Sequence, residues 1–362
     1  MSYFDRLLQI SNILEIPVIE GKKLRFEVIK EIFVFHYTNN PMYKKYCKKC
    51  KISPSSLKDF NDLNKIPFLT TWFLKEIFSS DRKLEFLTNK NIINLSSSGT
   101  TQAPVFYPFD EETLRRSTLA HGKIINELLQ FSSSQELLIL LPHPRESGTG
   151  ISKFHKDTYE PLVKKIWWGV DKDFKLKWKL IKDCLEKSDT TLHIIGTHFI
   201  WYELLMKLKK DKLSVALPSS KAVLTGGWKG REKKMSNKEF YNFIARSLNI
   251  QKRNIREQYG NIDVYTVFLS CECNRLHVHP WAYVSIRDKN LEEVCVGEKG
   301  VAVILTSIVT SYPAFILTSD KCKLTIDYDE KCECGRIGPT IEVCGRIKKE
   351  ELNLPEVNTQ SL

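Results

Sequence analysis

The sequence has no long apolar run. Its uninterrupted apolar stretches are short segments such as residues 137–141, whereas a membrane-spanning helix needs about 20 predominantly apolar residues. The N-terminal sequence MSYFDRLLQI also lacks the basic region followed by an apolar segment that marks a secretory signal peptide. We therefore expect a cytoplasmic protein with no membrane span.

Low-complexity linkers and internal repeats are absent as well. Hydrophobic residues make up 42% of the 362 residues and charged residues 27%, a composition that excludes disordered and collagen-like chains. At about 150 residues per domain, this length predicts two or three domains. The net charge is +12 at pH 7, so we expect the surface to attract anions such as nucleotides, phosphates or CoA-like groups.

The hydrophobic periodicity changes along the chain. Residues 1–60 have apolar positions at helical spacing, and we expect a helical N-terminal region. Short apolar runs then alternate with amphipathic helical stretches, which predicts an α/β core over residues 61–263. From residue 264 to 346 the runs are of the β type with turns rich in Gly, Asp and Cys, so a smaller β-rich subdomain follows, ahead of a short tail at 347–362.

A hydroxyl-rich loop follows one of the apolar runs. Ser and Thr residues surround Gly99 within residues 96–101. Backbone amides and hydroxyls in such a loop can surround an anion, and glycine lets the chain approach it closely. The Gly-Lys-Ser/Thr ending of a P-loop is absent. The loop is a candidate phosphate site, with an ordinary polar turn as the alternative.

Five short motifs occur in the order in which the acyl-adenylate-forming (ANL) superfamily has them, and the chain resembles that superfamily over about residues 60–350. Within the superfamily, residues 226–229 (GGWK), 277–282 (HVHPWA), 286–288 (IRD) and 310–313 (TSYP) most resemble the acyl-protein synthetase subunit of bacterial luminescence fatty-acid reductase. The segment 332–336 (CECGR) is also similar to phenylacetate-CoA ligases. The five motifs are SSGTT followed by Pro at 97–104, LTGGWK at 224–229, QYGNID at 258–263, TSD at 318–320 and GR at 345–346.

The resemblance implies an ANL-type N-terminal domain: α/β sheets flanked by helices with a smaller β-rich subdomain, and without the mobile C-terminal domain. It implies that ATP and Mg²⁺ activate a carboxylic acid as acyl-AMP in the α/β core. Such chemistry depends on positioning and on neutralising phosphate charge. The catalytic residues implied are Ser98, Thr100, Thr101 and Asp263, the last at the acidic magnesium position.

The resemblance also implies a set of nucleotide contacts. Gly226 and Gly227 let the backbone approach the adenine, Tyr259 stacks on it, Asp320 binds the ribose hydroxyls, and Arg346 marks the hinge. The full set of cofactor-binding residues is Ser97, Gly99, Gly226, Gly227, Tyr259, Gly260, Asp320 and Arg346.

Three departures from the superfamily pattern affect these expectations. Gln102 and Val105 stand where the common loop has Gly and Lys, and Asp263 stands where Glu is usual. The sequence ends soon after Arg346, so we expect it to lack the domain that supplies a catalytic lysine in most members. The acyl-protein synthetases acylate a cysteine near the C-terminus, but no cysteine follows Cys344 here.

Ten cysteines without a secretory signal argue against a disulfide framework. Three thiolates and one imidazole, from Cys271, His277, Cys332 and Cys334, form a ligand set that tetrahedral Zn²⁺ prefers. We expect a structural zinc site there, with Cys273 as the alternate ligand and small buried thiols as the competing interpretation. Phenylacetate-CoA ligase-like proteins place a zinc on comparable residues. The other pair with ligand spacing, at 47 and 50, has no second pair, and we interpret its spacing as accidental.

Several other residues have two open interpretations. His193 and His198 line the acyl pocket or are hydrogen-bonded core histidines. The tryptophans and lysines of residues 164–179 form a solvated amphipathic helix, or stack on single-stranded nucleic acid. No nucleic-acid motif accompanies them, so we expect no nucleic acid partner. Residues 143–150 are an ordinary solvated loop, or close over the nucleotide or substrate.

The combined expectation is an enzyme that activates a fatty or aryl acid as acyl-AMP. It then passes the acyl group to an external thiol, on a partner protein or CoA, because the C-terminal cysteine is missing. Two alternatives stay open: an adenylating enzyme whose acceptor is an amine or hydroxyl, and a catalytically weak, zinc-braced nucleotide-binding subunit.

Overall fold

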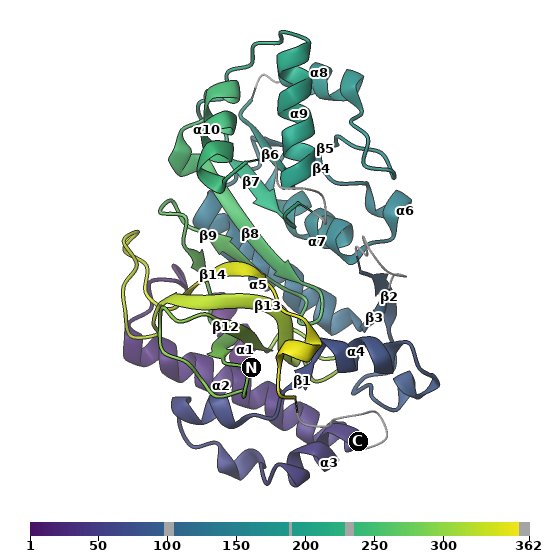
Figure 1. Cartoon of the computed structure of the whole chain (residues 1–362), viewed down its shortest axis with the longest axis vertical. Helices are drawn as coiled ribbons and strands as arrows, with labels where there is room; N and C mark the ends of the chain where they lie inside the picture. The colour runs from purple at the N-terminus through teal and green to yellow at the C-terminus, as the bar shows by residue number, and fades with distance from the viewer. Residues whose placement is uncertain (98–104, 188–189, 229–234, 355–362) are drawn as a thin grey trace.

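One mixed sheet of twelve strands extends through most of the molecule, with helices packed on it (Figure 1). The computed structural model describes residues 1–97, 105–187, 190–228 and 235–354. The strand order is β11-β12-β13-β14-β10-β9-β8-β7-β6-β4-β5, with β1 paired in parallel to β13. Strands β2 and β3 form a separate antiparallel pair. This arrangement confirms the predicted mixed α/β fold class.

The elements follow in chain order. The helices are α1 (Tyr3–Gln9), α2 (Val18–Asn39), α3 (Pro41–Lys49), α4 (Thr71–Phe78), α5 (Glu111–Leu129), α6 (Pro144–Ser147), α7 (Gly150–Tyr159), α8 (Trp178–Lys187), α9 (His198–Lys210) and α10 (Asn237–Leu248). The strands are β1 (Leu69–Thr70), β2 (Ile93–Ser96), β3 (Phe106–Phe109), β4 (Glu136–Leu140), β5 (Lys165–Trp168), β6 (Leu192–Thr197), β7 (Ala222–Thr225), β8 (Ile255–Asn261), β9 (Thr266–Ser270), β10 (Leu276–His277), β11 (Ala282–Arg287), β12 (Gly300–Thr306), β13 (Phe315–Ile326) and β14 (Thr340–Arg346). Short 3₁₀ helices are η1 (Pro54–Ser56), η2 (Phe60–Lys65), η3 (Asp81–Leu84), η4 (Glu160–Leu162), η5 (Lys252–Asn254) and η6 (Lys349–Glu351).

The sheet has a parallel half and an antiparallel half. Strands β5, β4, β6, β7 and β8 pair in parallel. From β8 through β9, β10, β14, β13 and β12 to β11 every pair is antiparallel. Strand β8 is therefore the element at which the two halves meet.

The central parallel strands β4, β6 and β7 are buried on both faces, which explains their continuous apolar sequences. Successive residues point to opposite faces of a strand. Leu138 and Leu140 of β4 pack in the core cluster that contains α8, α9 and α10. Leu137 and Ile139 pack in the other cluster, which contains α5 and α7. Helices therefore cover both faces of this half.

Local signals define the ends of the long helices. Asp110 accepts a hydrogen bond from the backbone amide of Thr113 and so caps the N-terminus of α5. Ser236 and Glu239 form a capping box at the start of α10. Both helices end in a left-handed residue, Gln130 and Asn249 respectively.

The N-terminal helices pack on the antiparallel half, as the purple segments of Figure 1 show. Arg25 of α2 is buried and donates hydrogen bonds to the carbonyl oxygens of Ala282, at 2.8 Å, and Val278, at 3.0 Å. Helices α1, α2 and α3 lie within residues 1–60. Arg25 thus links this helical segment to residues that lie more than 250 positions later in the chain.

Two local predictions are wrong. Residues 165–168, expected in a solvated amphipathic helix, form β5, because their backbone pairs in parallel with β4 at the edge of the sheet. Residues 143–150, expected as an ordinary loop, contain α6 and the start of α7. In the second case Pro144 stands at the first helical position, where a missing amide costs little.

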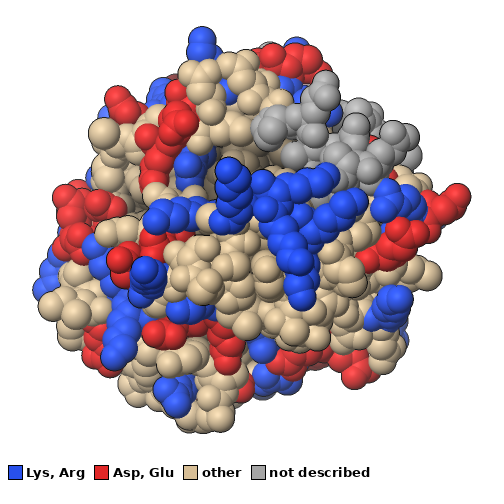
Figure 2. Space-filling view, turned by 90° about the horizontal axis from the view of Figure 1, so that it is seen from below, with Lys and Arg blue, Asp and Glu red and all other residues tan. Residues whose placement is uncertain are grey.

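The surface shows the basic charge balance. On the face seen from below, Lys and Arg side chains gather in a central cluster (Figure 2). Helix α3 alone carries Lys44, Lys45, Lys48 and Lys49. Over the described ranges, no helix combines the length and apolarity needed to cross a membrane.

Candidate nucleotide site and Cys-His cluster

Two glycines follow the carboxyl end of β7, where open parallel sheets bind their ligands. Gly226 and Gly227 have φ angles of 60° and 58°, a left-handed conformation that favours glycine. Thr225 pairs with Gln258 of β8, so the next residues along the two strands, Gly226 and Tyr259, lie side by side. Gly260 follows Tyr259 in β8 and is exposed. The structure thus brings together four of the predicted nucleotide contacts.

Asp320 of β13 connects this edge to the antiparallel half. Its carboxylate accepts a hydrogen bond from the hydroxyl of Tyr259 at 2.7 Å and from the amide of Asn261 at 3.4 Å. Arg346 of β14 pairs with Asp320 across the strands, with 3.4 Å between its Nε and Asp320 Oδ1. Burial and the neighbouring carboxylate raise the pKa of Tyr259, so its phenol is the donor. We refer to Tyr259, Asn261, Asp320 and Arg346 as the Asp320 group.

Ser97 closes the base of the hydroxyl-rich loop. Its backbone amide donates to the carbonyl of Val105 at 2.9 Å, and its hydroxyl accepts from the amide of Val105 at 3.2 Å. The neighbouring Ser96 forms a parallel bridge with Thr149, which brings the start of α7 beside the loop base. The other predicted phosphate contacts, Ser98, Gly99, Thr100 and Thr101, together with Gln102, lie outside the described residues.

Asp263 is buried and accepts hydrogen bonds from three hydroxyl groups. One carboxylate oxygen accepts from Tyr107 at 2.5 Å, the other accepts from Thr71, and its backbone carbonyl accepts from Tyr312 at 3.0 Å. Burial raises the pKa of this carboxyl group, and the two hydroxyl donors oppose that shift. Each oxygen already has a partner, so an ion bound here would use the remaining lone pairs or displace a hydroxyl. The magnesium role of Asp263 stays a prediction.

Sequence reasoning did not assign a role to Thr71 or Tyr107. Thr71 begins α4 and lies 192 residues from its partner, and Tyr107 lies in β3. No local spacing connects either residue to Asp263. The only available signal was that a buried carboxylate needs hydrogen-bond donors.

The four predicted metal ligands lie together beside the C-terminal end of β9, whereas Asp263 lies just before its N-terminal end. One ligand atom from each of Cys271, His277, Cys332 and Cys334 lies within 4.8 Å of the others. The Sγ atoms of Cys271 and Cys332 are 3.9 Å apart, and Cys334 Sγ is 3.4 Å from His277 Nε2. With Zn–S bonds of about 2.3 Å, two thiolates of a tetrahedral zinc lie about 3.8 Å apart. The spacing and the donor types therefore fit this ion.

The surroundings of the cluster favour thiolate at one position. Burial opposes ionisation of Cys334, but His277 and Arg336 lower the pKa of its thiol to about 6. Burial raises the pKa of Cys271 and of Cys332. His277 Nδ1 is buried and has no hydrogen-bond partner among the residues that the structure describes.

Other cysteines do not join this group. Cys273, the alternate ligand, is half-buried and does not belong to the set of four. Cys47 is buried in α3 while Cys50 is exposed at its end. In the described part of the chain, that pair belongs to no group of three or more metal-ligating side chains.

The two histidines at β6 have different surroundings. His193 stacks on Phe131, with ring centroids 4.3 Å apart, and hydrogen bonds to Gln135 at 2.9 Å. Burial lowers the pKa of His193 to about 3, as is typical of a core histidine. His198 lies at the carboxyl edge of the sheet, 3.2 Å from the carboxylate of Glu257.

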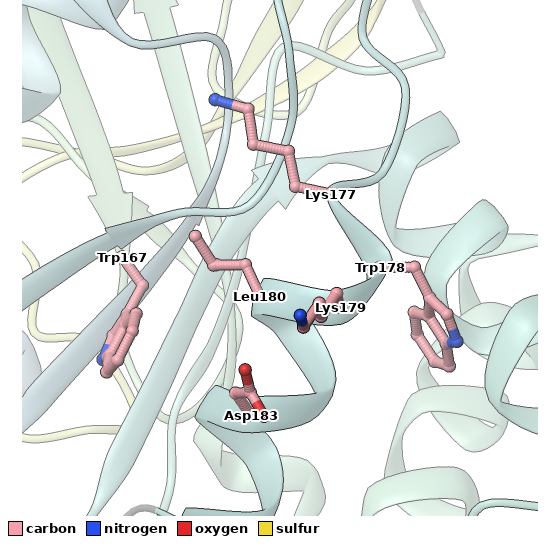
Figure 3. Close-up of a pocket in the computed structure, with 6 residues that line it drawn as sticks. All are labelled: Trp167, Lys177, Trp178, Lys179, Leu180 and Asp183. Carbon is pink, nitrogen blue, oxygen red and sulfur yellow. The ribbon is translucent and has the colours of Figure 1, made fainter.

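The tryptophans of the lysine-rich segment line a surface hollow far along the sheet from the Asp320 group. Figure 3 shows Trp167 of β5 facing α8, with Trp178 on the other side of the helix. Lys165 Nζ lies 3.2 Å from the centre of the Trp167 ring, and the indole donates to Glu136 at 2.7 Å. These contacts explain the segment as a solvated sheet edge. The complete lining is Trp167, Lys177, Trp178, Lys179, Leu180 and Asp183.

Comparisons with known proteins point in one direction. A family model described as "Acyl-protein synthetase, LuxE" matches residues 1–354. A long-chain-fatty-acid–luciferin-component ligase of Aliivibrio fischeri is 26% identical over 329 residues, covering 88% of this chain and 84% of the relative. A protein of the same name from Vibrio harveyi is 22% identical over 336 residues, covering 91% of this chain and 85% of the relative.

Solved structures give the same fold. The crystal structure of an open conformation of 2-hydroxyisobutyryl-CoA ligase, in complex with 2-HIB-AMP and CoA, has a TM-score of 0.75 at 17% identity. The match covers 94% of this chain and 80% of that one. Its postadenylation state in complex with R3-HIB-AMP has a TM-score of 0.74 at 18% identity, covering 92% of this chain and 69% of that one.

Proposed function

Because the chain belongs to the LuxE family of acyl-protein synthetases, we propose that it is a ligase that uses ATP to convert a carboxylic acid to acyl-AMP and then transfers the acyl group to a thiol. The relatives named long-chain-fatty-acid ligases support a fatty acid as the substrate. The fold shared with a ligase crystallised with an acyl adenylate supports the adenylate intermediate.

The Asp320 group is the observation on which this proposal depends most. A buried carboxylate with hydroxyl, amide and guanidinium partners lies next to two left-handed glycines at the carboxyl edge of the sheet. In our proposal Asp320 accepts hydrogen bonds from the ribose hydroxyls, while the backbone of Gly226 and Gly227 lies against the base. Tyr259 and Arg346 hold the carboxylate in place.

The remaining steps concern the phosphates and the acid. Ser97 closes the base of the loop whose hydroxyls we propose to neutralise phosphate charge. Catalysis further requires that the acid be held in line with the α-phosphate. Magnesium bound with ATP would supply further positive charge at the phosphates. The acid's carboxylate attacks the α-phosphate, pyrophosphate leaves, and the acceptor's thiolate later displaces AMP from the acyl carbon.

We propose an external acceptor thiol, on a partner protein or on CoA. The family description, an acyl-protein synthetase, favours a protein acceptor. We also propose that Cys271, His277, Cys332 and Cys334 bind a structural Zn²⁺. With four protein ligands the site is closed, and its metal would brace the antiparallel half without entering the reaction.

Pyrophosphate release over a panel of carboxylic acids tests this function. We expect release that depends on ATP and on a fatty acid, and thioester formation when CoA or a candidate acceptor protein is added. Hydroxylamine or an amine acceptor that replaced the thiol fully would favour the alternative acceptor chemistry. No release with any acid, alone or with proteins encoded nearby, would overturn the enzyme proposal and leave a nucleotide-binding subunit.

A further inference from the structure

A buried guanidinium lies beside the Cys-His cluster. Arg256 of β8 is 4% exposed, and its Nε and Nη1 atoms have no hydrogen-bond partner among the residues that the structure describes. Its Nη2 lies 3.9 Å from Glu272, too far for a hydrogen bond. That carboxylate is held instead by Arg336, at 2.9 and 3.0 Å. Arg256 is therefore a buried cation with two unpartnered nitrogen atoms in the described structure, beside a carboxylate to which it makes no hydrogen bond.

The strand register places Arg256 next to a metal ligand. Gln258 pairs with Leu269 in the antiparallel ladder of β8 and β9, and the amide of Glu257 donates to Ser270 Oγ at 2.8 Å. Continuing this register by two residues puts Cys271 opposite Arg256. Side chains directly opposite each other in an antiparallel pair lie on the same face with Cβ atoms about 5 Å apart. The guanidinium therefore points to the same face as the Cys271 thiol.

We infer that Arg256 is the buried counter-charge of the metal-loaded Cys-His cluster. This inference rests on the zinc site of the proposed function. Zinc binds the three cysteines as thiolates, and three thiolates with one Zn²⁺ and a neutral imidazole leave one net negative charge. The unpartnered N–H groups of Arg256 are the donors that this charge would attract.

The local charges agree with this assignment. Arg336 and Lys221 each lie near Arg256, and burial together with Arg256 lowers the pKa of Lys221. Glu272 is the carboxylate that faces both arginines. Three cations, of which Arg256 is buried and the other two are half-buried, face one carboxylate. The resulting excess of positive charge around Arg256 is costly unless an anion compensates it. The thiolates of the loaded cluster supply that anion.

The test measures zinc affinity and unfolding of the full chain, with Arg256→Met as the variant. Zinc is removed with a chelator and returned in competition with a chromophoric chelator. We expect Arg256→Met to weaken zinc binding by about 10- to 100-fold, the range known for residues that support metal ligands. Arg256→Lys, which keeps the charge, should recover part of the affinity. Arg253→Met is the matched control, because Arg253 is exposed and donates to Gln251.

Urea unfolding of the metal-free proteins shows whether Arg256 acts through its charge on the zinc cluster or only through the packing of its side chain. Without zinc, Arg256→Met should unfold at the same or a higher urea concentration than the unsubstituted chain, since it removes an uncompensated buried charge. With zinc, it should unfold at a lower concentration. The charge-transfer absorption of the Co²⁺-loaded variant should keep its intensity per metal, showing that the three thiolates still bind.

Two outcomes would overturn the role of Arg256 but leave the zinc site in place. One is equal zinc affinity in Arg256→Met and the unsubstituted chain. The other is a loss of stability in Arg256→Met that is equal with and without zinc. If the unsubstituted chain itself binds no zinc, the zinc site of the proposed function fails as well. Adenylate formation is measured separately and does not depend on either result.

Discussion

The Asp320 group and the Cys-His cluster lie on one sheet but are built in opposite ways. The Asp320 group draws two side chains from β8 and one each from β13 and β14 to an edge where Arg346 is 77% exposed. The cluster draws its ligands from two turn segments and strand β10, and three of its four residues are buried. The first arrangement leaves room for a ligand and the second encloses one. We therefore expect the Asp320 group to control activity and the cluster to control stability.

The sharpest test of this contrast is the loss of a cluster ligand. Cys332→Ser should reduce the free energy of unfolding by about 4 kcal/mol or more, because it removes a metal ligand and leaves the other thiols without the ion. Urea unfolding with and without a chelator measures the change. Cys295→Ser is the control, since that thiol is exposed. A stability loss no larger than the control's would contradict the bracing role.

Asp320→Ala should affect activity more than stability. It should reduce acid-dependent pyrophosphate release by about 100-fold, equivalent to roughly 2.7 kcal/mol, because charged hydrogen bonds to the ribose are lost. The free energy of unfolding should change by about 1 kcal/mol at most. Asp329→Ala, which removes an exposed partner of Lys22, is the control. An unchanged rate would remove Asp320 from the nucleotide site.

Lowering the pH should reduce the stability of the whole fold, through buried histidines that belong to neither the Asp320 group nor the Cys-His cluster. Burial lowers the pKa of His36, His121 and His193 to about 3 each. The unfolded chain therefore binds more protons between about pH 6.5 and pH 3, so stability is full above pH 6.5 and falls as pH decreases. Each group should account for roughly 2 kcal/mol by pH 5.

Unfolding of His193→Gln from pH 7 to pH 5 measures one of these contributions. The variant should lose stability less steeply than the unsubstituted chain, by about one proton. Parallel slopes would show that His193 is not the buried neutral group described.

The smallest effect expected is that of Tyr259→Phe. The variant keeps the ring beside Gly226 and removes the hydroxyl that holds Asp320, so the KM for ATP should rise about 5-fold, equivalent to about 1 kcal/mol. The kcat should change little. Tyr241→Phe, which loses a bond to Glu257 instead, is the control. A large fall in kcat would mean that Tyr259 contributes to the chemical step.

Much of the parallel half could be predicted, because its strands are continuous apolar runs of strand length and its helices are amphipathic. Strand β8 escaped prediction because its sequence IREQYGN is polar. Its backbone pairs with β7 and β9. Several of its side chains form hydrogen bonds or carry charge and do not pack as apolar groups. Strand β5 escaped for a related reason, since it lies at the sheet edge and carries Lys165 and two tryptophans.

The sequence alone determined which residue types are available: a hydroxyl-rich loop, two adjacent glycines, an acidic motif and a set of thiols and an imidazole that fit zinc. Short motifs determine such features because each depends on neighbours in the chain. Tertiary structure decided which of these groups meet and which are occupied. It brought Thr71 and Tyr107 to Asp263, and Arg256 near Cys271, because contacts between distant segments depend on strand register and helix packing, which local sequence does not specify.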